Sequence, residues 1–293
     1  KPPTCIGQRH NIAGFCRDIP TVVQTHVLIW LLGMLELVIS LSLCAGTWLI
    51  LDGGLKSRGG TTIAGYDPQA LGMGLLAIIA AGYFFGPLFG AALILSVMLH
   101  EFGHVAAYRI CGHADARFRL VPLMGGVAIS DQHPASQEKA FFIALMGPGI
   151  CIAPMVAAYA LADMLWDTAP YAAQFLQTFA MVTAALNFFN LLPFWPLDGG
   201  RCVQLISQSF WPGSTATLMA AMAAALIVAA LWMQSMLLFF FALMGAQSLF
   251  QAQNILGVQR RMGRMRGALA LGAYLFTTAA HFMGGASLVL RYL

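Results

Sequence analysis

The sequence predicts an all-α membrane protein that crosses the bilayer several times, and two observations support this fold class. Of the 293 residues, 59% are hydrophobic and only 9% are charged, whereas about 25% of the residues of a soluble domain are charged. The apolar residues also form runs long enough to cross a bilayer as a helix, which takes about 20 residues. We therefore expect about six to eight transmembrane helices in contact with the lipid bilayer.

Candidate helices follow from the apolar runs and from the residues that interrupt them. Gly86 and Pro87 divide one long run, because proline breaks a helix, so a short helix followed by a spanning helix is expected there. The helices are expected at about 26–51, 70–85, 88–112, 140–163, 170–192, 215–233, 235–253 and 267–290. They divide the chain into four parts. These are an N-terminal polar segment (1–25), an additional membrane segment with its loop (26–69), a membrane core (70–253), and a basic loop with an additional C-terminal helix (254–293).

The basic loops predict the orientation of the chain in the membrane. The arginines between 260 and 266 place the loop before the last helix in the cytoplasm, and counting helices back places Lys139 on the same side. A net charge of +4 spread over short loops does not predict a nucleic-acid partner. The alanine-rich chain is typical of the plasma or inner membrane of a prokaryote. The N-terminus lies outside if 26–51 spans, and Cys5 and Cys16 could then form a disulfide.

A short polar motif lies inside the apolar run at 88–112. It reads His100-Glu101-Phe102-Gly103-His104. Positions i and i+4 of a helix face the same way, so the two imidazoles can bind one zinc ion with Glu101 beside them as a base. Such a short motif also occurs by chance, but a carboxylate at bilayer depth costs roughly 3 kcal/mol and is functional by default. The predicted orientation places the motif near the cytoplasmic end of its helix.

Zinc sites in hydrolases usually have three protein ligands and one open position. A third histidine in the extended form of the motif is absent, because Ile110 occupies its position. The last glutamate of the chain, Glu138, lies in a polar segment. Asp198 is the best remaining candidate, because it follows the apolar run 170–192 on the same side of the membrane. His281, in the last helix, is a competing candidate, although a lone histidine on an apolar helix more often packs with a hydrogen bond.

The segment before Asp198 is expected to break its helix. Pro193 and Pro196 forbid a regular helix there, and unwound backbone at membrane depth is tolerated only where it is buried in protein or lines a cavity. Gly199 and Gly200 allow a sharp turn and a close approach of the backbone. A broken helix therefore carries the candidate third ligand.

Two motifs together resemble those of the site-2 protease family of intramembrane zinc metalloproteases. The first is His100 to His104, and the second runs from Asn190 through Pro193 to Asp198-Gly199. Val121–Ala128 resembles the membrane-associated hairpin of the family, and Gly147-Pro148-Gly149 the opening of its next helix. The resemblance covers 88 to about 201 well and 70–253 more loosely. The sequence has no PDZ-like insertion between the motifs, which leaves regulation and substrate choice open.

This resemblance implies an intramembrane zinc endopeptidase that hydrolyses a peptide bond of a membrane-spanning protein near the cytoplasmic face. One Zn²⁺ per chain would be held by His100, His104 and Asp198, and a bound water would lose its proton to Glu101. Asn190 is a candidate to bind the substrate backbone or the developing oxyanion. The alternative role of Asn190 is to terminate its helix. The oligomeric state is left open.

Gly125 and Gly126 allow two interpretations. They form a turn in a re-entrant or membrane-associated β-hairpin, and that hairpin could also offer a strand edge that holds an extended substrate. Glu36 either lines a path for substrate or water, or is protonated and bonded to a neighbouring helix. Two other functions remain alternatives, namely a peptidase that matures a small exported peptide and a non-proteolytic zinc protein or transporter. A transporter would need polar ligands along several helices.

Overall fold

The computed structural model describes residues 31, 33–51, 68–121, 125–236, 239, 242–243, 245 and 259–292. These residues are mostly helical, and five of their helices are long and apolar enough to cross a membrane, namely Gly33–Leu51, α3 (Pro87–Ile110), α4 (Gln137–Leu165), α5 (Pro170–Asn190) and α7 (Thr215–Trp232). The predicted class of helical multi-pass membrane protein is thereby confirmed.

Three further helices complete the described part, namely α2 (Pro68–Phe85), α6 (Asp198–Phe210) and α9 (Arg264–Tyr292). None of these is among the five, so the number of crossings stays a prediction. The predicted polar segment 1–25, with Cys5 and Cys16, lies outside the described residues, as does most of 235–253.

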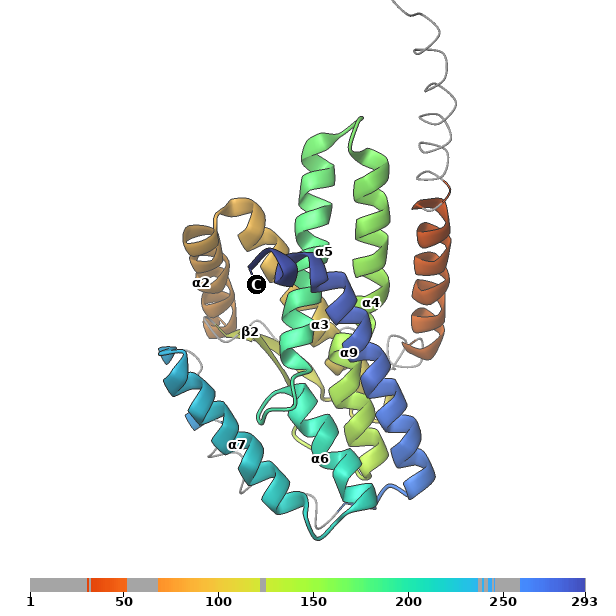
Figure 1. Ribbon diagram of the computed structural model, residues 1–293, viewed down its shortest axis with the longest axis vertical. Helices are drawn as coiled ribbons and strands as arrows, with labels where there is room; N and C mark the ends of the chain where they lie inside the picture. The colour runs from red at the N-terminus through yellow and green to blue at the C-terminus, as the bar shows by residue number, and fades with distance from the viewer. Residues whose placement is uncertain are drawn as a thin grey trace, which may run out of the picture.

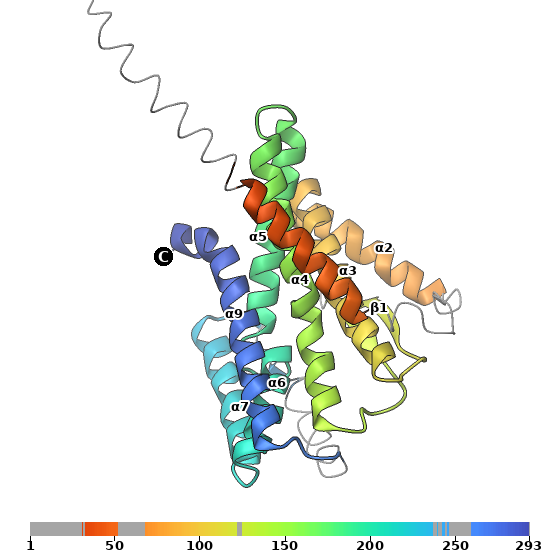
Figure 2. The same ribbon diagram turned by 90° about the vertical axis from the view of Figure 1, so that its right-hand side faces the viewer.

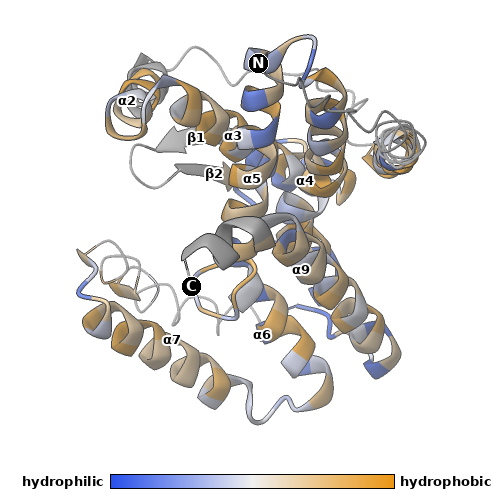
Figure 3. Cartoon of the chain, turned by 45° about the horizontal axis from the view of Figure 1, so that its top comes forward, coloured by the Kyte–Doolittle hydropathy of each residue, from blue (hydrophilic) through white to orange (hydrophobic). Residues whose placement is uncertain are grey.

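Large apolar side chains cover the outside of the molecule, as a lipid environment requires. Trp48 and Leu49 near the end of the first helix are exposed, as are Tyr83 on α2 and Trp232 on α7. Figure 3 shows apolar residues along α7 and along the coloured part of α2. Figures 1 and 2 show the helix Gly33–Leu51 on the outer side of the bundle, and its last residue, Leu51, packs with α3 and α4.

Helices α3, α4 and α5 pack against one another and form the centre of the bundle. Small residues allow the close approach. A Cβ added at Gly103 of α3 would overlap the carbonyl oxygen of Met146 of α4, and Ala180 and Ala184 of α5 are completely buried. Helix α9 packs on α4, α5 and α6. Helix α7 lies apart from α3 and α5 in Figure 1 and packs against α6.

Breaks between helices occur where the sequence predicts them. Pro87 begins α3, and Gly86 before it has φ of 82°, a conformation that favours glycine. Helix α5 ends at Asn190, the next seven residues are not helical, and α6 begins at Asp198. Proline at 193 and 196 explains this break, because neither residue has the N–H that a continuing helix uses.

Two antiparallel strands connect α3 to α4. They are β1 (Arg117–Val121) and β2 (Gly125–Ile129), paired from Arg117 with Ile129 to Val121 with Gly125. The base of this ribbon is held by polar contacts, because Arg117 pairs with Asp131 at 3.0 Å and the backbone N–H of Asp131 donates to Asp115 at 2.6 Å. Strand β1 packs beside α2, and both strands lie against α3. The turn at 122–124 lies outside the described residues.

Candidate metal centre

The two histidines of the motif lie on one face of α3 and point into the protein. Their Nε2 atoms are 3.1 Å apart, as the positions i and i+4 of a helix allow. Both side chains are buried, with His100 4% exposed and His104 6% exposed. Helix α3 therefore presents two imidazole nitrogens to one point in the interior.

Asp198 completes the cluster from the first residue of α6. Its Oδ2 atom lies 3.1 Å from Nε2 of His100 and 3.2 Å from Nε2 of His104. Two ligands bound at about 2.0–2.1 Å to a tetrahedral zinc are about 3.3 Å apart, so these spacings fit one ion. Among the residues that the structure describes, these three side chains form the group that could hold a metal.

The tautomer of each histidine follows from the contacts of its other ring nitrogen. Nδ1 of His104 lies 2.7 Å from the carbonyl oxygen of Ile143, which can only accept, so this nitrogen donates. Nδ1 of His100 lies 2.7 Å from Oδ1 of Asn187. The amide of Asn187 is oriented by its own Nδ2, which donates to the carbonyl of Thr183 at 2.8 Å. Both Nε2 atoms are therefore left with a lone pair for a metal.

A positive charge is required at the point where these atoms meet. Two imidazole lone pairs and a carboxylate oxygen face one another at 3.1–3.2 Å in a buried site. The donor set of two nitrogens and one carboxylate oxygen is of the kind found in catalytic zinc sites with an open position.

Glycines leave the space that the side chains of the candidate metal ligands occupy. A Cβ at Gly147 of α4 would overlap the imidazole ring of His104, so the glycine lets α4 pass close to that ring. A Cβ at Gly199 would overlap the carbonyl of Leu191, and one at Gly200 the carbonyl of Phe194. The backbone therefore approaches closely at both glycines, and Asp198 lies beside the histidines where α6 begins in contact with the non-helical segment before it.

Glu101 lies beside the cluster. It is on α3, is 8% exposed, and is close enough to interact electrostatically with His104. A carboxylate next to three metal-binding side chains can exchange a proton with a water bound there. Asn190 is the last residue of α5 and is half-buried. It lies one turn after Asn187, which contacts His100.

Among the described residues, the other sequence-predicted residues are not part of the His100, His104 and Asp198 group. Gly125 and Gly126 begin β2 opposite Val121 and Leu120. His281 lies on α9 and donates from Nε2 to the carbonyl of Pro148 at 2.9 Å, as a packing residue would. Glu36 is exposed on the first described helix.

Sequence reasoning missed the groups that orient the histidines. A hydrogen bond to another helix is expected of Asn187 on an apolar helix, but the sequence does not identify its partner, His100. The carbonyl of Ile143 carries no signal in the sequence. A general rule could have indicated both, since a histidine that binds a metal almost always donates its other ring nitrogen to an acceptor.

The fold and the site define a class, namely a helical membrane protein with a buried His-His-Asp cluster and an adjacent glutamate. Residues 163–235 match the family model of Peptidase family M50. Stage IV sporulation protein FB of Bacillus subtilis is 29% identical over 120 residues, which are 41% of this chain and 40% of that protein. A zinc metalloprotease of Methanocaldococcus jannaschii is 30% identical over 131 residues, 45% of this chain and 37% of that protein.

A solved structure, the site-2 protease from Methanocaldococcus jannaschii, aligns with 61% of this chain and 87% of its own, at 22% identity and a TM-score of 0.42. The chain spans about two fifths of the length of these two relatives. The family match and these relatives bear out the resemblance of this chain to the site-2 protease family that its motifs indicate.

Proposed function

We propose that this chain is an intramembrane zinc endopeptidase that hydrolyses a peptide bond in a membrane-spanning protein. One observation carries the proposal: Nε2 of His100, Nε2 of His104 and Oδ2 of Asp198 lie 3.1–3.2 Å from one another inside a membrane protein. Glu101 is buried beside them. This combination serves hydrolysis, because a metal and a base are held at one point.

One Zn²⁺ would be held by His100, His104 and Asp198, where it would supply Lewis acidity and acidify a bound water. Glu101 accepts the proton of the attacking water and returns it to the leaving amine. Asn187 and the carbonyl of Ile143 hold both histidines in the tautomer that leaves Nε2 free.

Asn190 is proposed to bind the substrate backbone or the developing oxyanion. It ends α5 at the start of the non-helical segment, where a substrate could approach. The ribbon of β1 and β2 is proposed to be membrane-associated and to hold an extended substrate at its edge, with Gly125 and Gly126 at the turn end. An extended substrate exposes its carbonyls, whereas a helical one hides them in hydrogen bonds.

The membrane setting of this site is also a proposal. The arginines between 260 and 266 place the start of α9 at the cytoplasmic face, and Arg260 bonds through its backbone to the segment before α4. The end of α3 that carries His104 would therefore face the cytoplasm, and cleavage would occur near that face of a prokaryotic plasma or inner membrane.

Cleavage of a membrane substrate by the purified full chain in liposomes tests the proposal. We expect wild type to cut at least one member of a panel of single-span substrates, and Glu101→Gln to bind zinc normally but to cut none. Cleavage by both proteins would contradict the role of Glu101, and cleavage by neither would contradict the protease function. Zinc transport into the same liposomes would instead support the alternative of a transporter. Cleavage of exported peptides alone would support the alternative of a maturation peptidase.

A further inference from the structure

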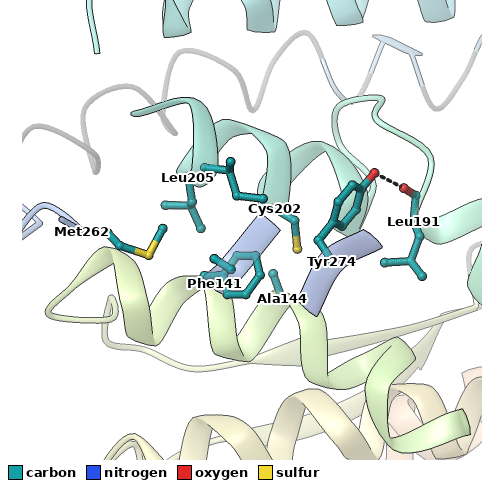
Figure 4. Close-up of a cluster of buried hydrophobic side chains, with 9 residues drawn as sticks. Phe141, Ala144, Leu191, Cys202, Leu205, Met262 and Tyr274 are labelled. Atoms are coloured by element: carbon teal, nitrogen blue, oxygen red, sulfur yellow. Dashed lines mark hydrogen bonds between the residues drawn. The ribbon is translucent and has the colours of Figure 1, made fainter. Parts of the chain in front are cut away.

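Tyr274, in the middle of α9, makes a hydrogen bond to the segment that leads to Asp198. Its side chain is 7% exposed, and its hydroxyl donates to the carbonyl of Leu191 at 2.7 Å. Figure 4 shows this bond at the edge of a cluster of buried side chains from α4, α6 and α9. Leu191 itself is completely buried, so water does not compete for its carbonyl.

The carbonyl of Leu191 has the start of α6 as its other neighbour. It is the nearest group that a Cβ at Gly199 would meet, and the two would overlap. Gly199 follows Asp198 directly. One carbonyl group is thus contacted by the hydroxyl of Tyr274 and by the backbone beside the third ligand.

From this arrangement we infer that Tyr274 is a positioning residue for the metal centre. Its hydroxyl fixes the carbonyl of Leu191, the start of α6 packs on that carbonyl, and the Oδ2 atom of Asp198 is thereby held 3.1–3.2 Å from the histidine nitrogens. Tyr274 itself does not coordinate the ion. The inference rests on the proposed metal centre and extends it to a helix that the sequence predicted as an addition to the core.

Helix α9 can act as a fixed reference because it is anchored along its length. Before it begins, the N–H of Met262 donates to Oε1 of Gln137 at 3.0 Å, and the N–H of Gln137 donates to the carbonyl of Arg260 at 3.0 Å. Towards its end, the hydroxyl of Tyr159 donates to the carbonyl of Gly284 at 2.6 Å. Tyr274 lies between these two anchors.

Packing alone would give a different expectation from positioning. If Tyr274 served only to fill the cluster of Figure 4, phenylalanine would replace it with little effect on the metal. If its hydroxyl holds Leu191, loss of that one oxygen should weaken metal binding although the cluster stays full. Groups that orient metal ligands typically change metal affinity or activity by about 10–100-fold. Because Tyr274 acts through one more link, we expect about tenfold.

The test compares Tyr274→Phe with Tyr159→Phe in the full chain in lipid nanodiscs. Each variant removes one tyrosine hydroxyl that makes a hydrogen bond between α9 and another part of the bundle. Only the bond of Tyr274 is made to a group that contacts the backbone next to Asp198. Zinc affinity is measured by competition with a chelator, and the absorption spectrum of the cobalt-loaded protein reports the ligand geometry. We expect about tenfold weaker zinc binding and an altered cobalt spectrum for Tyr274→Phe, and wild-type values for Tyr159→Phe.

Wild-type affinity and spectrum in Tyr274→Phe would overturn the inference, as would equal weakening in both variants. If Tyr274→Phe does not fold, 4-aminophenylalanine and 4-methylphenylalanine at 274 replace it, since only the amino group can donate. Equal zinc affinities for that pair would again overturn the inference. Because zinc binding is read without cleavage, a failure here is distinct from failure of the proposed protease function, which Glu101→Gln tests.

Discussion

Replacement of Asn187 by leucine should weaken zinc binding through His100. In the structure Oδ1 of Asn187 accepts from Nδ1 of His100 at 2.7 Å, and both residues are buried. Leucine has a similar size but no acceptor, so it leaves a buried N–H without a partner, at a cost of about 1–3 kcal/mol. The carbonyl of Thr183 loses the bond from Nδ2 but keeps its own helical partner. Most of this free energy is therefore lost from the contact that orients His100.

The expected size of the effect is about 10–100-fold in zinc affinity, or about 1.4–2.7 kcal/mol. Asn187→Asp keeps an acceptor beside His100 and should bind zinc close to wild type, because a carboxylate can orient a metal-binding histidine equally well. The measurement is a chelator competition with purified protein, followed by single-turnover cleavage of a membrane substrate at saturating zinc.

Asn190→Leu is the matched comparison, one turn further along α5. If Asn190 contacts the substrate or the oxyanion, this variant should keep its zinc and lose about 10²–10³-fold in the cleavage rate. If Asn187→Leu binds zinc as tightly as wild type, Asn187 does not orient His100 for metal binding. Equal loss of zinc in both variants would show that leucine damages the end of α5 in general.

Two further outcomes follow from the close packing around the centre and from the charges at the base of the ribbon. Gly147→Ala should abolish zinc binding, because its Cβ would overlap the ring of His104. Gly149→Ala should keep zinc binding, because its Cβ would meet only Met146, at 3.5 Å. Similar zinc affinities of the two variants in a chelator competition would contradict this prediction. The backbone N–H of Asp131 lowers the pKa of Asp115 below 3.8, so the ribbon should gain stability from this carboxylate above that pH and lose it as pH falls through the lower pKa. The protection factor of the Asp131 amide, which compares its hydrogen-exchange rate with the intrinsic rate at the same pH, should therefore fall in acid. Asp115→Asn should remove that fall.

The sequence predicts the metal ligands because ligand chemistry is local. Two histidines four residues apart on an apolar helix specify a spacing and a face, and the prolines at 193 and 196 specify where α5 ends. These features need no knowledge of distant residues. The structure accordingly brings His100, His104 and Asp198 together as the motifs indicated.

The groups that accept hydrogen bonds from the two histidines could not be predicted in the same way. The acceptor for His104 is the carbonyl of Ile143, a group that every residue has, and its selection depends on how α4 passes α3. Gly147 makes that passage possible, but a glycine in a helix has many explanations in a sequence. The side of the N-terminus likewise depends on 26–51, whose preceding residues the structure does not describe.

The cluster also constrains how its two halves can move. The histidines belong to α3 and Asp198 to α6, and the described contacts that fix their relative position run through α4, α5 and α9. An opening motion that admits substrate without releasing the metal must therefore leave α3, α4, α5, α6 and α9 together. Helix α7 packs against α6 but contributes no ligand to the cluster, and α2 packs against α3 and β1 without contributing one. Movement of these outer helices would leave the spacing of 3.1–3.2 Å between the ligand atoms unchanged.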